Sequence, residues 1–230
     1  MHFGWIEVVL LACTSVSIAL LLGLWRQERR AQRRLQELEM GRLKGQLTPH
    51  FLFNALNGIC ELGYEDPEAA DRAITRLSGL LRKSLEDGDR QEITVKAEFD
   101  FLEDYLALQR MLQREGLNAQ IELDPAAEYA RVPAMILQPL VENALTHGRQ
   151  DGAVDVRISA RRNGRILCLE VRDHGPGPQP LAAGVRVGIG LANTRARLAH
   201  VCGAEANMDL IKGQDGGALA RITLPFRQIA

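Results

Sequence analysis

The sequence has few cysteines and almost no net charge. The cysteines are widely scattered, form no C-x-x-C pair, and are Cys13, Cys60, Cys168 and Cys202. This pattern argues against a structural zinc site and against a disulfide framework. The formal net charge is −1 and the sequence pI is near 6.5, so no global positive field draws the chain onto nucleic acid. We therefore expect no direct binding of nucleic acid.

Charged residues are missing from one stretch near the N-terminus, residues 8–25. A stretch of that length just spans the hydrocarbon core of a bilayer, which is roughly 30 Å thick. Arginines follow it at once, starting with Arg26, and the positive-inside rule then places the chain from Arg26 onward in the cytoplasm. We predict a single-pass membrane anchor at residues 1–25 and regard a buried core helix as the less favoured alternative.

Residues 26–47 have no strand pattern and form the predicted juxtamembrane linker. Leucines recur among arginine, glutamine and glutamate at Leu35, Leu38, Leu43 and Leu47. This narrow apolar seam is typical of a short dimerising helix. A solvated helix whose arginines contact anionic lipid is equally consistent with the pattern.

Residues 48–115 predict helices. Apolar residues at helical spacing run from Leu43 to Ile59, and Pro49 inside this run predicts a kink that exposes His50. By periodicity alone, His50 is more readily a structural residue than a chemical one. Asp66 and Pro67 then predict an N-cap and the first position of a second helix, and a third helical pattern runs over 95–114. Two chains of such helical hairpins make a four-helix bundle.

The remaining chain, residues 116–230, alternates between strand and helix patterns. An apolar helix is expected over 134–148, with Gly148 as its stop. A hairpin of two strands is expected around a turn at Asn163 and Gly164. The other expected elements are strands over 119–124, 205–211 and 218–225, a glycine-rich loop over 184–190 and a helix over 191–201.

Three short motifs in this part suit a nucleotide. Asp173, at the end of a predicted strand, can accept a hydrogen bond from the amino group of adenine. Gly175 and Gly177 follow it, and they let the backbone approach the base closely.

The phosphates have candidate partners of their own. Gly188 and Gly190 open a predicted helix, so their backbone N–H groups are free for phosphate oxygens. Asn143, on the preceding helix, offers a neutral oxygen to a magnesium ion. Each motif is weak alone, but their order and spacing together strongly predict an ATP site.

These segments resemble a known family. ENALTHG, DHGPGP and GIGLANTRARL are similar to the N, G1 and G2 boxes of the ATPase domain shared by gyrase, Hsp90, histidine kinases and the MutL proteins. QLTPHFLFNALN resembles the phosphoacceptor box of the LytS-type sensor histidine kinases. The resemblance covers nearly all of the chain after residue 43, and it departs from the family at His174, where asparagine is more usual.

The resemblance implies a bacterial histidine kinase in the cytoplasmic membrane, with its catalytic part in the cytoplasm. It implies that His50 is phosphorylated from ATP within a homodimer and that the partner is a response regulator, of the LytTR DNA-binding type. Asn54, one helical turn after His50, is a candidate for a phosphatase role, and a residue that only caps or packs the kinked turn is the equal alternative. The ATP-binding residues implied are Asn143 (also the Mg²⁺ ligand), Asp173, Gly175, Gly177, Gly188, Gly190 and Asn193.

The predicted fold is therefore α/β. A transmembrane helix (1–25) and a helical linker (26–47) precede the dimerisation and phosphoacceptor helices (48–115) and an α/β-sandwich ATP-binding domain (116–230). The candidate cations that would neutralise the phosphates are Arg149, Arg195 and Arg197. Each of them is equally consistent with an ordinary surface charge.

Two other functions share this ATPase fold. An ATP-hydrolysing conformational switch carries a glutamate one helical turn before the magnesium-binding asparagine, but Pro139 stands at that place here. Glu142, adjacent to Asn143, points about 100° away around the helix, so hydrolysis is disfavoured. An inactive membrane scaffold is the other alternative, and the intact His50 and Asp173 argue against it.

Overall fold

The computed structural model describes residues 49–88, 90–112, 116–150, 152–177, 189–213 and 216–228. The predicted membrane anchor, the linker, the start of the kinked helix and Gly188 lie outside these residues. Within the described part, no helix combines the length and the apolar character that crossing a bilayer requires.

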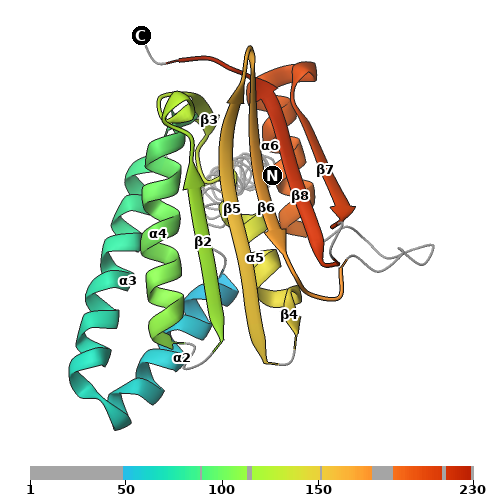
Figure 1. The fold of residues 1–230 in the computed structure, drawn as a ribbon. Helices are drawn as coiled ribbons and strands as arrows, with labels where there is room; N and C mark the ends of the chain where they lie inside the picture. Colours follow the sequence, from blue (N-terminus) through green and yellow to red (C-terminus); the bar gives the residue numbers. More distant parts are fainter. Residues whose placement is uncertain are drawn as a thin grey trace, which may run out of the picture. The chain divides into compact units, whose positions relative to one another are not determined.

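A helical hairpin comes first, made of α2 (Pro49–Glu65) and α3 (Pro67–Gly88) (Figure 1). The predicted boundary between the two helices is confirmed: Asp66 Oδ1 accepts a hydrogen bond from the N–H of Ala69 at 2.9 Å, and Pro67 opens α3. Ala55 of α2 and Ala73 of α3 are buried in the core, because each lies on the apolar side of its helix.

The third helix, α4 (Val95–Leu112), packs against both α3 and the sheet. It starts where Thr94 Oγ1 accepts from the N–H of Ala97 at 3.1 Å. Just before it, β1 (Glu92–Thr94) pairs with β3 (Arg131–Pro133), a small antiparallel pair that the sequence patterns did not predict. Helix α4 therefore connects the hairpin to the rest of the fold.

The main sheet has strand order β2-β5-β6-β8-β7, and the short β4 pairs with β5 (Figure 1). Strands β2 and β5 run parallel, and the other neighbours are antiparallel. The strands are β2 (Leu117–Leu123), β4 (Arg149–Gln150), β5 (Ala153–Asn163), β6 (Ile166–Asp173), β7 (Asn207–Lys212) and β8 (Ala218–Pro225), with 3-10 turns η1 (Pro125–Ala127) and η2 (Gly203–Glu205).

The β5–β6 hairpin was predicted correctly except for its turn. Asn163 pairs with Ile166, so the turn residues are Gly164 and Arg165, one position later than the sequence indicated. Gly164 has φ of 63°, a left-handed conformation that glycine adopts without a steric penalty.

Helices α5 (Gln138–His147) and α6 (Ile189–Cys202) lie on the same side of the sheet (Figure 1). The inward side chains of the strands alternate with exposed ones, as in Val156, Ile158 and Leu169, which are all fully buried. One face of the sheet is thus covered by helices, and the predicted α/β arrangement of a helical hairpin followed by a sheet domain is confirmed.

The start of one helix was predicted wrongly. The helix expected from residue 134 begins only at Gln138, because residues 134–137 form a bent segment. Met135 has φ of 54° and is the one non-glycine residue with positive φ in the described chain. A left-handed residue cannot continue a right-handed helix, so the apolar run Ala134–Leu137 is buried as a loop rather than as a helical turn.

Candidate active site

Asp173 lies at the end of β6 and is 5% exposed. Its Oδ1 accepts hydrogen bonds from the backbone N–H groups of Gly175, at 3.0 Å, and Ala218, at 3.1 Å. Its second oxygen, Oδ2, takes no part in these two bonds. Two backbone donors thus fix the carboxylate in place, as recognition of a base requires.

Glycines pack closely around Asp173. A Cβ on Gly175 would lie 2.6 Å from the Cα of Gly148, and a Cβ on Gly148 would lie 2.7 Å from the Cβ of Asp173. Gly177 has φ of +78°, and its Cβ would lie 2.7 Å from the carbonyl oxygen of Gly217. Real Cβ atoms do not approach that closely, so the predicted Gly175 and Gly177 are required by contacts between backbone segments. We call Gly148, Asp173, Gly175, Gly177 and Gly217 the glycine cluster.

Sequence reasoning missed two members of this cluster. Gly148 was interpreted only as a helix stop, a role it does fill, since its N–H donates to the carbonyl oxygen of Ala144 at 2.8 Å. Gly217, whose Cβ would collide with the carbonyl oxygen of Asp173, was not singled out. Its signal was the pair Gly216-Gly217 directly before the last strand.

The predicted phosphate-side residues lie on α5 and α6. Asn143 is half-buried on α5, and Gly190 and Asn193 are exposed on α6. The starts of these helices are adjacent, because a Cβ on Gly190 would lie 3.7 Å from the Cβ of Pro139. The glycine cluster adjoins the other end of α5 through Gly148, so Asn143 lies on the helix that joins the two parts of the site.

His50 lies in the first turn of α2, and the structure does not describe its side chain. The next residue, Phe51, is 4% exposed, and its ring centroid lies 4.9 Å from that of Tyr105 on α4. Burial raises the pKa of Tyr105, and the charge of Glu142 raises it further. Because Phe51 is buried against the ring of Tyr105, this aromatic contact anchors the backbone beside His50 to α4.

A cavity of about 350 Å³ lies between α2, α4 and α5. Asn54 from α2 and Glu142 from α5 both line it. Glu142 Oε1 also accepts from Gln138 Nε2 at 2.9 Å. The predicted Asn54 therefore faces the same cavity as Glu142, the residue next to Asn143, so this cavity lies between the histidine-bearing helix α2 and helix α5.

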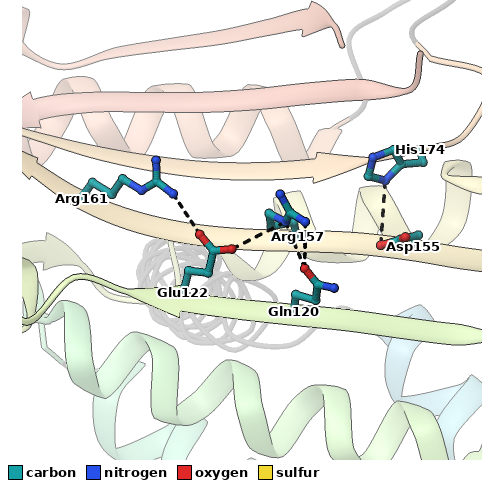
Figure 2. A network of polar contacts seen from close by, with 6 residues as sticks. All are labelled: Gln120, Glu122, Asp155, Arg157, Arg161 and His174. Atoms are coloured by element: carbon teal, nitrogen blue, oxygen red, sulfur yellow. Dashed lines mark hydrogen bonds and ion pairs between the residues drawn. The ribbon is translucent and has the colours of Figure 1, made fainter. Parts of the chain in front are cut away.

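The outer face of the sheet is polar (Figure 2). Arg157 donates to Gln120 Oε1 at 2.9 and 3.1 Å, and Arg161 pairs with Glu122 at 2.9 Å. These exposed contacts join the edge strand β2 to β5, although pairs of this kind contribute little stability. They account for charged residues on strands that are buried on their other face.

His174, where the family more often has asparagine, lies beside this polar face (Figure 2). Its Nδ1 is buried without a hydrogen-bond partner and is 3.9 Å from Asp155 Oδ1. His147 and His200 are exposed on α5 and α6. His174 and His147 thus both adjoin the glycine cluster, since they neighbour Asp173 and Gly148 in the sequence.

The three candidate cations differ in surroundings. Arg149 and Arg195 are exposed. Arg197 is half-buried, and its guanidinium donates to the carbonyl oxygen of Ala134 at 2.7 Å. Through this hydrogen bond, Arg197 binds the bent segment that precedes α5.

The sequence reasoning also missed Glu98, which is 1% exposed on α4. Its carboxylate accepts from the N–H groups of Met135, at 2.7 Å, and Leu137, at 2.8 Å. Burial raises the pKa of Glu98 to about 7, although the two N–H donors and the charge of Arg197 lower it. The signal was present: Glu98 shares the apolar face of α4 with Val95, Phe99 and Leu102, where a carboxylate is out of place.

The family comparisons agree with these motifs. Residues 38–117 match the family model described as Histidine kinase, and residues 130–228 match Histidine kinase-, DNA gyrase B-, and HSP90-like ATPase. The second match implies that residues 130–228 form an ATP-binding domain, and the glycine cluster lies within this range.

Individual proteins are similar over the same region. The sensor histidine kinase BtsS of Escherichia coli is 34% identical over 173 residues, 74% of this chain and 31% of that protein. The sensor protein LytS of Staphylococcus haemolyticus is 33% identical over 147 residues, 62% of this chain and 25% of that protein. The solved structure of the Acinetobacter baumannii histidine kinase AdeS is 16% identical with a TM-score of 0.47, covering 86% of this chain and 98% of that chain.

The chain thus spans about a third or less of the length of these two curated relatives. The two family matches together cover well over half of it, in the order that the motifs predicted. The chain therefore belongs to the histidine kinase family, and sensor histidine kinases including a LytS protein are among its relatives.

Proposed function

We propose that this chain is a membrane-anchored kinase that transfers the γ-phosphoryl group of Mg-ATP to His50 and then to an aspartate of a response regulator. The observation that carries the proposal is the arrangement around α5. One end of α5 meets the glycine cluster at Gly148, and its middle shares a cavity with the helix that bears His50.

The residues of the site fit an adenine nucleotide. Asp173 is buried and fixed by two backbone donors, so its Oδ2 suits the amino group of adenine. The glycines beside it let the surrounding backbone segments pack directly on one another, which holds the main chain around the carboxylate in one arrangement. Asn143 would hold magnesium, which supplies charge neutralisation at the phosphates when bound.

Transfer to His50 needs mainly in-line positioning. A ring nitrogen of His50 forms a bond to the γ-phosphorus while the bond from that phosphorus to the bridging oxygen of ADP breaks. The buried contact between Phe51 and Tyr105 holds the backbone next to His50. Gly190 and Asn193 lie exposed at the start of α6, where backbone N–H groups suit phosphate oxygens.

A homodimer is supported by the outer surface of the hairpin. Large apolar side chains are exposed on α2 at helical spacing: Phe53 is 68% exposed, Leu56 50% and Tyr64 92%. On α3, Ile74 and Leu85 are also half-exposed or more. Apolar stripes of this kind favour burial against a second copy, as in a four-helix bundle.

ATP hydrolysis without a histidine acceptor is less well supported. Pro139 takes the place of the water-activating glutamate, and it lies beside Gly190. Glu142 lines the cavity toward α2 and binds Gln138. Neither residue is placed to act as a base toward water at the phosphates.

The remaining parts of the proposal rest on sequence and family. They are the anchor at 1–25 in the bacterial cytoplasmic membrane, the linker at 26–47, and the division of the remainder into helices (48–115) and ATP domain (116–230). A regulator of the LytTR type and a phosphatase role for Asn54 complete it. Asn54 is exposed on α2, where it can meet a regulator.

The experiment compares the full chain with Asn143→Asp in γ-labelled Mg-ATP. The aspartate carboxylate adds a negative charge beside the phosphates and disturbs how magnesium is held there. We therefore expect the rate of labelling to fall at least about tenfold. Asn163→Asp, at the exposed end of β5, is the matched control and keeps wild-type labelling. Equal labelling of all three proteins would remove Asn143 from the site.

A further inference from the structure

The bent segment at residues 134–137 is contacted by three helices besides the one it precedes. Helix α4 contributes the carboxylate of Glu98, and α6 contributes the guanidinium of Arg197. Helix α3 contributes Ser84, which is buried and has its Oγ 3.7 Å from the sulfur of Met135. The segment therefore connects the histidine-bearing hairpin with both nucleotide helices.

These contacts hold a conformation that the segment would not adopt alone. A non-glycine residue in the left-handed region carries a strain of about 1–3 kcal/mol, and such strain persists only where the surroundings enforce it. Here Met135 is 3% exposed, and its N–H and that of Leu137 are both taken by Glu98. A carboxylate in front of the N-terminus of α5 also interacts favourably with the helix dipole.

We propose that Glu98 and Arg197 are positioning residues, which hold residues 134–137 and thereby set where α5 and Asn143 lie relative to α6 and the hairpin. Arg197 is on the same helix as the phosphate-side residues Gly190 and Asn193. When nucleotide displaces α6, the hydrogen bond from Arg197 moves the carbonyl of Ala134. This movement is passed to α3 through the contact between Met135 and Ser84. This inference rests on the proposed function, because it assigns how ATP binding is coupled to transfer.

The test uses the full chain and the variants Glu98→Gln, Arg197→Ala and Arg197→Lys. Glutamine keeps the shape of Glu98 but presents an amide donor to one of the two N–H groups. Lysine keeps the positive charge of Arg197 and can still donate a hydrogen bond to the carbonyl of Ala134. Glu103→Gln is the matched control, since Glu103 is exposed on the same helix as Glu98.

We expect Glu98→Gln and Arg197→Ala to lower the labelling rate at saturating ATP about tenfold, with ATP affinity changed by less than about threefold. Arg197→Lys recovers part of the rate, and Glu103→Gln matches wild type. The double variant with Glu98→Gln and Arg197→Ala labels no more slowly than the slower of these two single variants, because the two residues act as one unit. A loss of ATP affinity as large as the loss of rate, or a wild-type rate in both single variants, would overturn the inference.

A second measurement separates this inference from the proposed function. Hydrogen exchange is followed in residues 77–88 of α3 with and without ADP. We expect ADP to change exchange there in wild type and not in Arg197→Ala. A wild-type chain that shows this coupling but takes no label would contradict the proposed function alone, and labelling without the coupling would contradict the inference alone. If Glu98→Gln does not fold, the two variants at the half-buried Arg197 decide both tests.

Discussion

The helical hairpin and the sheet domain differ in how many of their large apolar side chains are exposed. Of the eight large hydrophobic side chains that are exposed in the described chain, five lie on α2 and α3: Phe53, Leu56, Tyr64, Ile74 and Leu85. The sheet and its helices bury nearly all of theirs. The sheet domain thus completes its own core, whereas the hairpin retains a surface suited to a partner.

The two regions also hold their candidate functional groups by different means. Around Asp173, backbone segments contact each other through glycines, so the position of the carboxylate depends on the absence of Cβ atoms. On α2, His50 and Asn54 are placed by helical spacing and by the burial of Phe51. We expect the first arrangement to tolerate almost no change in shape, and the second to tolerate much more.

The sharpest test of this difference is the same substitution in both regions. Gly175→Ala puts a methyl group 2.6 Å from the Cα of Gly148, and it should lower the free energy of unfolding by roughly 2–3 kcal/mol and abolish ATP binding. Gly79→Ala, in α3, meets nothing within 4 Å and should leave ATP binding unchanged, because alanine favours helix. Thermal unfolding and ATP titration measure both. Equal effects of the two substitutions would contradict the comparison.

A smaller change at the same cluster tests the base contact alone. Asp173→Asn keeps an oxygen for the N–H groups of Gly175 and Ala218 but replaces the second oxygen with an amide donor. We expect ATP to bind about 10- to 100-fold more weakly, the effect of a mismatched buried pair of about 1–3 kcal/mol. Calorimetric titration with ATP measures the change, and equal affinity of both proteins would refute the assignment.

The surface of the hairpin is tested by its association. Phe53→Ser removes a side chain that is 68% exposed in the single chain, so it should weaken the dimer about 10- to 100-fold and leave the fold intact. Ile211→Ser, on the exposed side of β7 and 45% exposed, is the control and should leave association unchanged. Analytical sedimentation measures the dimer association of both variants. A dimer that is insensitive to Phe53→Ser would show that this face of α2 is not the interface.

The smallest effect on autophosphorylation is expected at Asn54. Asn54→Ala should keep the labelling rate and lose the ability to dephosphorylate the response regulator, because an amide one turn from His50 can orient the attacking water. The assay is the decay of labelled regulator with each kinase variant and ADP. Decay as fast with Asn54→Ala as with wild type leaves Asn54 without a phosphatase role.

The sequence predicted the elements of the fold well where one pattern governed them. The helix starting at Pro67, the β5–β6 hairpin and the strand ending at Asp173 follow from capping residues, a turn signal and alternation. The bent segment at 134–137 was missed because its apolar residues read as a helical turn. Its conformation is set by Glu98, which is 37 and 39 residues away in sequence from its two donors.

The candidate site was predictable in its motifs and less so in its physical basis. Asp173, Gly175 and Gly177 were found from their order after a strand, and the structure adds that Gly148 and Gly217 form the other side of the same contacts. Such contacts between distant segments leave no local pattern. Glu98 had a local signal, a carboxylate on the apolar face of α4, but its two donors become apparent only in three dimensions.

The most direct test of the central claim is labelling of His50. Wild type and His50→Gln are incubated with γ-labelled Mg-ATP, and the label is tested for the acid lability of a phosphohistidine, with ATP affinity measured alongside. We expect acid-labile label on the wild type, none on His50→Gln, and equal ATP affinity, because the sheet domain holds ATP without His50. Acid-labile label that survives in His50→Gln would contradict the account.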